Sequence, residues 1–192
     1  APILGSLLDP VKANRGDLFA ADYRILSDLL NKALATEHQA SIFDDKEDDR
    51  WELALSAQGL LEAARLLDDR YSLVITNVPY LSIRKQESTL RGYCESHYPE
   101  SKHDLANVFL ERCLELSLTK GQGVLQIVMP QNWLFLGTYK KQREALLKTT
   151  SWNFLARLGP GAFETISGEI VQAILITQTN IAPNAMTTLR GI

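Results

Sequence analysis

The sequence predicts an α/β fold in which parallel strands alternate with crossover helices and a C-terminal antiparallel hairpin completes the sheet. Two short apolar runs, 71–76 and 124–129, have the length and composition of buried strands. Amphipathic helical patterns at 104–118 and 138–149 follow them in alternation, which is typical of a parallel sheet. A Gly-rich loop joins two final β-rich runs and predicts the hairpin: Trp152–Leu158 and Ile170–Thr177.

The bulk composition indicates a folded, soluble chain. Of its 192 residues 45% are hydrophobic, enough for a core of one domain or part of a larger one. The net charge of -3 argues against coating nucleic acid by charge alone, although a local basic groove stays open. Cys94 and Cys113 match no zinc or redox spacing, and no other pattern indicates a metal.

Three further features concern the setting of the chain. No signal peptide and no apolar run near about 18 residues is visible, so we expect a cytoplasmic protein that does not enter a membrane. Two cysteines in this length indicate free thiols in a reducing compartment. The first residue is Ala1 rather than Met, which fits a piece cut from a longer protein.

The N-terminal part, residues 1–70, reads as a helical segment. Residues 1–16 contain Gly and Pro and suggest an irregular start, whereas apolar residues in 21–36 recur at threes and fours. A second helix is predicted at about 50–69, with Asp48 or Asp49 as its N-cap.

The first predicted strand is followed by a polar, basic stretch at 81–103, which we interpret as a long loop. Loops of that length are usually functional or disordered. The amphipathic helix at 104–118 comes next, and Gly121 and Gly123 are expected to end it before the second strand.

The first strand ends in an unusual way, at Asn77-Val78-Pro79-Tyr80. Proline cannot donate to a sheet ladder, and Asn and Tyr are unfavourable to bury without partners. Ligands of open parallel sheets bind at the carboxyl ends of strands, where Pro130 to Trp133 also lie after the second strand. By local pattern alone, a ligand site and an ordinary proline turn are equally good interpretations.

The segment SLVITNVPY resembles the mark of the N6-adenine-specific DNA methyltransferases of restriction-modification and phage-defence systems, Asn-Pro-Pro-Tyr after a strand. Four further segments similar to this family follow in the same order: DLANVFLERCLEL, GQGVLQIVMPQNWLF, YKKQREALLK and LARLGPGAFETISGEIVQAILI. The resemblance covers residues 71 to about 178. Within the family, NVPYL with a basic stretch after it looks most like the very large single-chain methylases of BREX-type phage defence.

The resemblance implies a partial Rossmann-like class I methyltransferase fold. Residues 71–180 would be the C-terminal half of the catalytic domain, and 181–192 a tail. The implied activity is transfer of a methyl group from S-adenosylmethionine to N6 of adenine in DNA. The family holds this donor with a Gly-rich turn after its first strand, but the chain offers only ILGSLLDP near its start. We therefore expect the donor site upstream, its residues unknown, and an isolated chain that is inactive.

The resemblance also implies roles for the residues after the strand. The Asn77 side-chain oxygen and the carbonyl of residue 78 would accept the two N–H groups of the adenine amine. The family usually has Pro where this chain has Val78, so the carbonyl persists but the rigidity of the turn is in question. Pro79 would shape the turn and Tyr80 would stack on the base. Phe163 matches the family's second stacking aromatic, with plain packing as its alternative role.

The implied partners are double-stranded DNA with a flipped adenine and subunits of a restriction or defence system. Two alternatives stay open: an N-methyltransferase acting on RNA bases or protein glutamine, and a non-catalytic module that binds DNA or a partner subunit. Trp133 reads more readily as a core residue than as a cleft residue. Several basic residues suit either phosphate contacts or a solvated face: Arg84, Lys85, Arg91, Lys140, Lys141 and Arg143.

Overall fold

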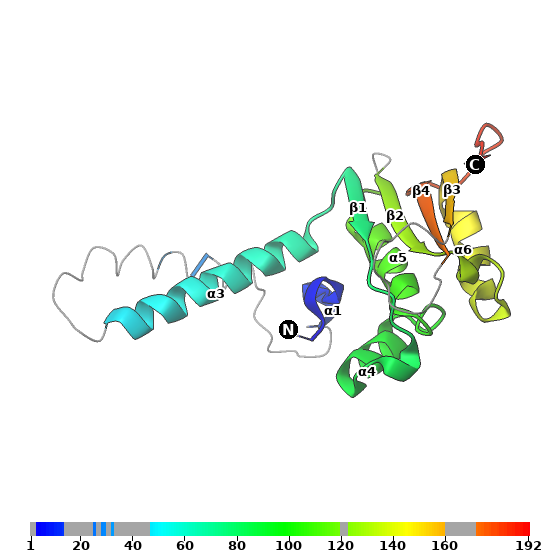
Figure 1. Cartoon of the computed structure of the whole chain (residues 1–192). Coiled ribbons are helices and arrows are strands. Elements are labelled where there is room, and N and C mark those ends of the chain that lie inside the picture. Colours follow the sequence, from blue (N-terminus) through cyan, green and yellow to red (C-terminus); the bar gives the residue numbers. More distant parts are fainter. Residues whose placement is uncertain are drawn as a thin grey trace. The chain divides into compact units, whose positions relative to one another are not determined.

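The computed structural model describes residues 3–13, 25, 28–29, 32, 47–119, 123–159 and 172–192 (Figure 1). The chain divides into two compact units, and apart from its first few residues these are Gly5–Asp69 and Arg70–Ile192. Within the described ranges, no helix has both the length and the apolar character needed to cross a bilayer.

The N-terminal unit contains a short 3-10 helix, Gly5–Leu7, and two α-helices, α1 (Pro10–Ala13) and α3 (Glu47–Asp68). The predicted helix at 50–69 is confirmed. Its predicted cap is wrong, because the helix begins at Glu47 and both candidate aspartates lie within its first turn. Most of the helix expected at 21–36 lies outside the described residues.

The second unit is built on one mixed sheet. Its strands are β1 (Leu73–Asn77), β2 (Val124–Pro130), β3 (Ser151–Gly159), β4 (Ala173–Thr179) and β5 (Arg190–Gly191). The strand order is β1-β2-β4-β3-β5. β1 runs parallel to β2, and β4 runs antiparallel to both β2 and β3, so the predicted parallel pair and closing hairpin are confirmed. The two-residue β5, parallel to β3, lies in the stretch expected to be a tail.

The stretch interpreted as a long loop is wrong in its middle part, which forms a 3-10 helix, Ile83–Lys85, and the helix α4, Ser88–His97. Leu90, Cys94 and Tyr98 recur every four residues and are 8%, 0% and 1% exposed. This apolar row is the reason that the segment folds as a helix. Polar and charged residues surround this row, so the composition of the segment does not indicate a helix.

The next helix, α5 (Leu105–Leu116), confirms the predicted crossover helix. Its N-cap is Asp104, whose carboxylate accepts the backbone N–H of Ala106 at 2.9 Å. The helix ends before the predicted glycines. Gly123 serves a different purpose, because a Cβ atom there would collide with the backbone of Leu118.

The core lies between one face of the sheet and the helices that cross it. In β2, Leu125, Ile127 and Met129 are fully buried and alternate with half-buried residues. Burial of one large apolar side chain contributes about 1.5–3 kcal/mol. Helix α6 (Lys140–Thr149) confirms the predicted helix at 138–149 and follows two 3-10 helices, Gln131–Leu134 and Gly137–Tyr139.

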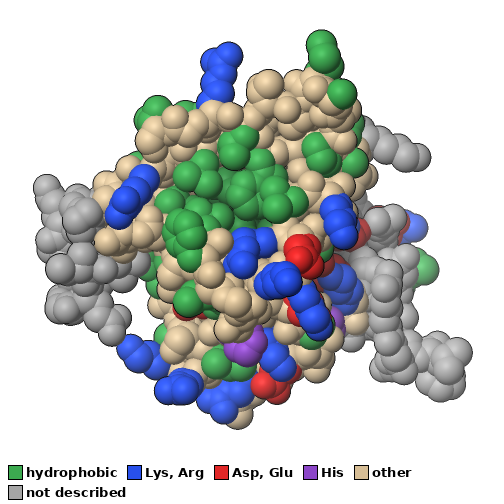
Figure 2. Space-filling model, turned by 90° about the vertical axis from the view of Figure 1, so that its right-hand side faces the viewer, with side chains coloured by type: hydrophobic (Ala, Val, Ile, Leu, Met, Phe, Trp, Pro, Cys, Tyr) green, Lys and Arg blue, Asp and Glu red, His purple; other side chains and the backbone are tan. Residues whose placement is uncertain are grey.

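Other apolar side chains stay in contact with solvent. Figure 2 shows hydrophobic side chains gathered on one face of the molecule, with Lys and Arg side chains around them. At the end of the sheet, β1 exposes 53% of Leu73 and 66% of Ile75. The opposite side of this strand contributes Val74, which packs against the core.

A buried polar network fastens α6 to α5. The Asn107 amide donates to Gln142 Oε1 at 2.8 Å, and Gln142 Nε2 donates to the Asn107 carbonyl at 3.1 Å and to Glu111 Oε1 at 3.0 Å. Asn107 and Gln142 are each 2% exposed. Burial raises the pKa of the Glu111 carboxyl, while its hydrogen bonds oppose this shift.

Substitution of the central member of this network is expected to destabilise the chain. Gln142→Leu keeps a similar volume but leaves Asn107 and Glu111 without their buried partner, so the free energy of unfolding should fall by about 1–3 kcal/mol. Urea unfolding measures this loss. Lys148→Leu places the same side chain at an exposed position of α6 and is the control. Equal stability of the two variants would contradict the assignment.

Candidate functional site

The candidate site lies where β1 ends. In the parallel pair, Asn77 is in register with Val128, so the carboxyl ends of β1 and β2 meet at one edge of the sheet. Pro130 ends β2 at this edge, and the 3-10 helix Gln131–Leu134 begins directly after it. The two strand ends that the sequence singled out therefore lie side by side, at the edge where open α/β sheets bind ligands.

Residues 77–80, here called the acceptor turn, alternate between solvent and core. Asn77 and Pro79 are exposed, Val78 is 5% exposed, and Tyr80 is half-buried. The Val78 side chain belongs to the core cluster, and its N–H donates to the carbonyl of Val128 at 3.5 Å. Proline has no N–H for this bond. Valine thus anchors the turn by a side chain in the core and by an extension of the strand ladder.

The acceptor turn also carries two oxygen acceptors, one on the Asn77 side chain and one on the Val78 backbone. Within the described residues, no hydrogen bond uses the side-chain amide of Asn77 or the backbone carbonyl of Val78. Each oxygen keeps two lone pairs for an external donor. Neighbouring acceptors of this kind suit a ligand that presents two N–H groups.

Tyr80 is supported by the core of its unit. Its ring packs against the core cluster that contains Val78. The pKa of Tyr80 is raised to about 12, first by burial of the phenol and second by the negative charge of Asp104. The side chain is therefore a neutral, partly buried aromatic at physiological pH.

The chain beyond Tyr80 is fastened to the start of α5. The Leu81 carbonyl accepts the N–H of Leu105 at 2.9 Å, and the N–H of Ile83 donates to the carbonyl of His103 at 2.9 Å. The Gln86 side chain, 3% exposed, adds a third bond by donating to the Leu81 carbonyl at 3.1 Å. The acceptor turn is thus followed by a segment with little freedom.

Two of the arginines proposed for phosphate contacts have structural roles instead. Arg91 Nη2 donates to the carbonyl of Gln86 at 3.1 Å. Arg143 Nη1 donates to the carbonyls of Trp133 and Leu136, the latter at 2.7 Å, and so holds the turn after β2. Both arginines thus bind backbone carbonyls of their own unit.

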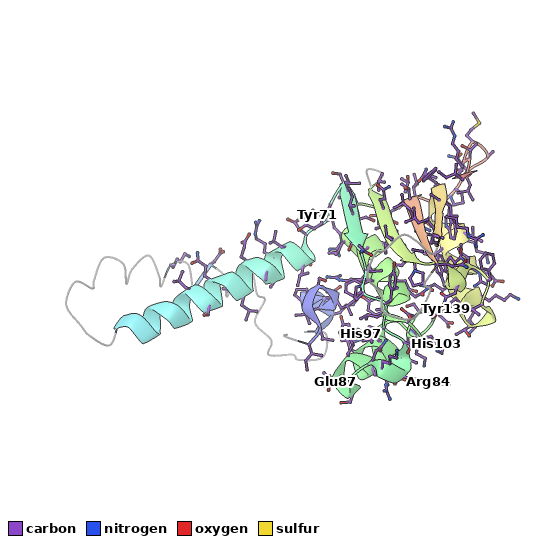
Figure 3. All side chains as sticks on the ribbon, viewed as in Figure 1. Tyr71, Arg84, Glu87, His97, His103 and Tyr139 are labelled. Carbon is purple, nitrogen blue, oxygen red and sulfur yellow. The ribbon has the colours of Figure 1, made fainter. Side chains whose placement is uncertain are left out.

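The lysine candidates and the remaining arginine are exposed. Lys140 lies 3.8 Å from Glu144, and Lys141 lies 3.3 Å from Glu100. Two exposed side chains in the segment after the acceptor turn have no such ion pair in the described part of the chain: Arg84 and Lys85. Figure 3 shows Arg84 on the same side of the fold as His103 and Tyr139.

Trp133 is a core residue, as predicted. It is 0% exposed, and its ring centroid lies 5.8 Å from that of Trp152. Sequence reasoning missed Phe135, which is 75% exposed and follows the same turn. The sequence contained a signal for this exposure. On a 3-10 helix, residues two positions apart lie on different sides, so an aromatic two residues after a buried Trp seldom shares its burial.

Phe163 lies outside the described residues. The described residues on either side of its segment are nonetheless held by the sheet. Gly159 and Pro130 each pair with Ala173, and the Gln172 carbonyl accepts the N–H of Gln131 at 2.9 Å. The described residues that flank this segment, Gly159 and Gln172, therefore lie at the edge of the sheet where β2 ends.

The described residues do not form a cradle for S-adenosylmethionine. β1 continues into the acceptor turn and β2 into Pro130 and Gln131, so neither strand end in the described sheet carries a Gly-rich turn. Gly5 has a positive φ of 51°, but it lies in a 3-10 helix and follows no described strand. The described residues thus offer hydrogen-bond acceptors at the end of β1 but no glycine cradle.

Comparison with known proteins gives a consistent assignment. Residues 12–162 match the family model described as Eco57I restriction-modification methylase. The chain is 33% identical over 163 residues to the adenine-specific methyltransferase PglX of Lacticaseibacillus casei (strain Zhang), covering 82% of the chain. It is 35% identical over 112 residues to the adenine-specific methyltransferase BrxX of Escherichia coli O9:H4 (strain HS), covering 58%. The chain spans 13% and 9% of the lengths of these relatives.

A solved structure supports the fold. The chain in the DrdV–DNA complex is 15% identical and superposes with a TM-score of 0.50, covering 71% of this chain and 16% of that one. The resemblance seen in the sequence is thereby confirmed at the level of the family. The chain belongs to the family of Eco57I restriction-modification methylases.

Proposed function

We propose that this chain carries the acceptor-base half of an adenine-specific DNA methyltransferase that uses S-adenosylmethionine. The observation that supports this best is the pair of adjacent oxygen acceptors at the end of β1, the Asn77 amide and the Val78 carbonyl. The names of both curated relatives agree with adenine as the substrate.

The chemistry of the adenine amine explains why two acceptors are needed. Its nitrogen is a weak nucleophile because the lone pair is delocalised into the ring. Acceptors for both N–H groups allow the nitrogen to become tetrahedral, with its lone pair directed at the methyl group. They also stabilise the positive charge that develops on the amine in the transition state. Asn77 and Val78 together supply these acceptors without a basic side chain.

Tyr80 contributes a stacking surface for the base. A target adenine in duplex DNA must leave the helix, and an aromatic face offsets part of the unstacking energy. Such stacking is worth about 1–3 kcal/mol per base. Phe163 would close the opposite side of the base, and the described residues that flank its segment lie at the same edge of the sheet as the acceptor turn.

S-adenosylmethionine supplies the methyl group in this reaction. The residues that bind it would be other than those described. The proposal therefore assigns the donor site to another part of a longer protein, as the coverage of the relatives suggests. It includes the bacterial cytoplasm as the location, and further subunits of a restriction or defence system as partners.

Asn77→Ala in the full-length protein tests the acceptor role. We expect kcat for DNA methylation to fall by a factor on the order of 10² because one preorganised acceptor is lost. Binding to duplex DNA should persist in a gel-shift assay.

Asn153→Ala is the matched control. It removes an exposed amide from β3, near the amino end of β2, and should leave methylation unchanged. If the unsubstituted protein transfers no methyl group and still binds DNA, the catalytic proposal is wrong and a binding module is the better assignment.

Arg84 and Lys85 are expected to meet DNA phosphates because both are exposed next to the acceptor turn. The double substitution by alanine should weaken binding equally for all sequences and reduce the slope of log K against log salt by about 2. The double substitution of Lys140 and Lys148 on α6 is the control, with an unchanged slope. Equal slopes in both variants would refute this contact.

The 192-residue chain is expected not to bind S-adenosylmethionine, because its described strand ends lack a glycine cradle. Isothermal titration calorimetry on the folded chain should detect no heat of binding, whereas the full-length protein should bind. Micromolar binding by this chain would show that the donor site lies within it.

A further inference from the structure

We propose that Phe135 is a DNA-contact residue, whose ring packs against the base pair that is uncovered when the target adenine leaves the helix. Phe135 begins a short exposed stretch, residues 135–138, here called the Phe135 turn. The inference rests on the proposed function, since it adds a residue to that same site.

The Phe135 turn lies at the edge of the sheet that carries the acceptor turn. β2 ends at this edge with Pro130, and α6 leads from there to β3. β3 begins at the opposite edge, because Ser151 pairs with Thr179, which in turn pairs with Val124, the first residue of β2. The stretch between β2 and α6 is therefore confined to the carboxyl end of β2.

The backbone of the Phe135 turn is held at both ends. Trp133 and Tyr139, which flank it, are 0% and 5% exposed and belong to the core cluster. The Asn132 carbonyl accepts the N–H of Phe135 at 3.0 Å and the N–H of Leu136 at 3.1 Å. The Leu136 carbonyl accepts the N–H of Tyr139 at 3.2 Å. Two buried aromatic anchors and these three bonds leave the turn little freedom.

The side chains at the start of this turn are apolar and face solvent. Phe135 is 75% exposed and Leu136 is 47% exposed. The segment Gln131–Thr138 contains no acidic residue, so nothing in it repels the phosphates of a nucleic acid. A single exposed leucine is ordinary on a protein surface. A phenyl ring presented by a fixed backbone, with a leucine beside it, is instead preorganised to contact an apolar ligand.

Opened DNA offers such a ligand at this edge. Extrusion of the target adenine uncovers the flat faces of the neighbouring base pairs, and proteins insert Phe or Leu side chains at unstacked steps of this kind. The duplex must approach the edge at which Asn77 and Tyr80 would receive the extruded base. Phe135 lies at that edge, so its ring replaces part of the stacking that the neighbouring base pair has lost.

Photo-crosslinking in the full-length protein tests the contact directly. p-Benzoylphenylalanine replaces Phe135, and the protein is irradiated with a mixture of unmethylated duplex fragments. We expect crosslinks to DNA, at bases next to the adenine that sequencing identifies as methylated. The same amino acid in place of Leu147 is the matched control and should give no DNA crosslink. Leu147 is 54% exposed but lies in the last part of α6, shortly before β3 begins at the opposite edge.

Phe135→Ala in the full-length protein tests the consequence for catalysis. On a paired target, kcat/KM for methylation should fall by about 10- to 100-fold because stacking on the opened duplex is lost. A mismatched target adenine is easier to extrude, so there the activity should stay within about threefold of the unsubstituted protein. Phe135→Trp keeps an aromatic ring and should retain activity on the paired target. Leu147→Ala should change neither activity.

Two outcomes would overturn the inference. Crosslinks from position 135 to protein alone would show that another segment or subunit covers the Phe135 turn. Equal losses for Phe135→Ala on paired and mismatched targets would show that the ring does not support the opened duplex.

Failure of the proposed function gives a different result. If Asn77→Ala keeps its activity, the acceptor role is wrong, whereas the crosslinks from position 135 still decide whether Phe135 meets DNA.

Discussion

The parallel pairing of β1 with β2 is the constraint on which the second unit depends. It places Asn77 beside Val128 and so brings two strand ends to one edge of the sheet. The same pairing directs the apolar face of β2 toward α5 and the core. A shift of one residue would turn each side chain of β1 to the opposite face and exchange Asn77 with Val78. Core packing and the direction of the acceptors therefore have a common origin.

Helix α5 connects this pairing to the rest of the fold. Its first turn holds the segment after Tyr80, and its middle holds α6 through Asn107. Both attachments use buried or half-buried polar groups, which are far more sensitive to geometry than apolar contacts. Stability and site geometry are thus coupled through one helix, although different residues serve each purpose.

The sequence predicted the elements whose apolar periodicity is strong, namely β1, β2, α5 and α6, together with the strand-end position of Asn77. It failed for α4, because the row of Leu90, Cys94 and Tyr98 is diluted by polar neighbours. Arg91 and Arg143 were interpreted as surface cations, because no sequence pattern predicts that an arginine will bind backbone carbonyls. The roles of Asn77, Tyr80 and Phe163 stay predictions.

The position of β1 at the end of the described sheet has a practical consequence for handling this chain. An edge strand presents N–H and C=O groups that can pair with another extended chain, and here the exposed Leu73 and Ile75 add an apolar surface beside them. Two molecules that meet along this edge form a continuous sheet. We therefore expect the isolated chain to self-associate as its concentration rises, and a fused covering strand to prevent this pairing.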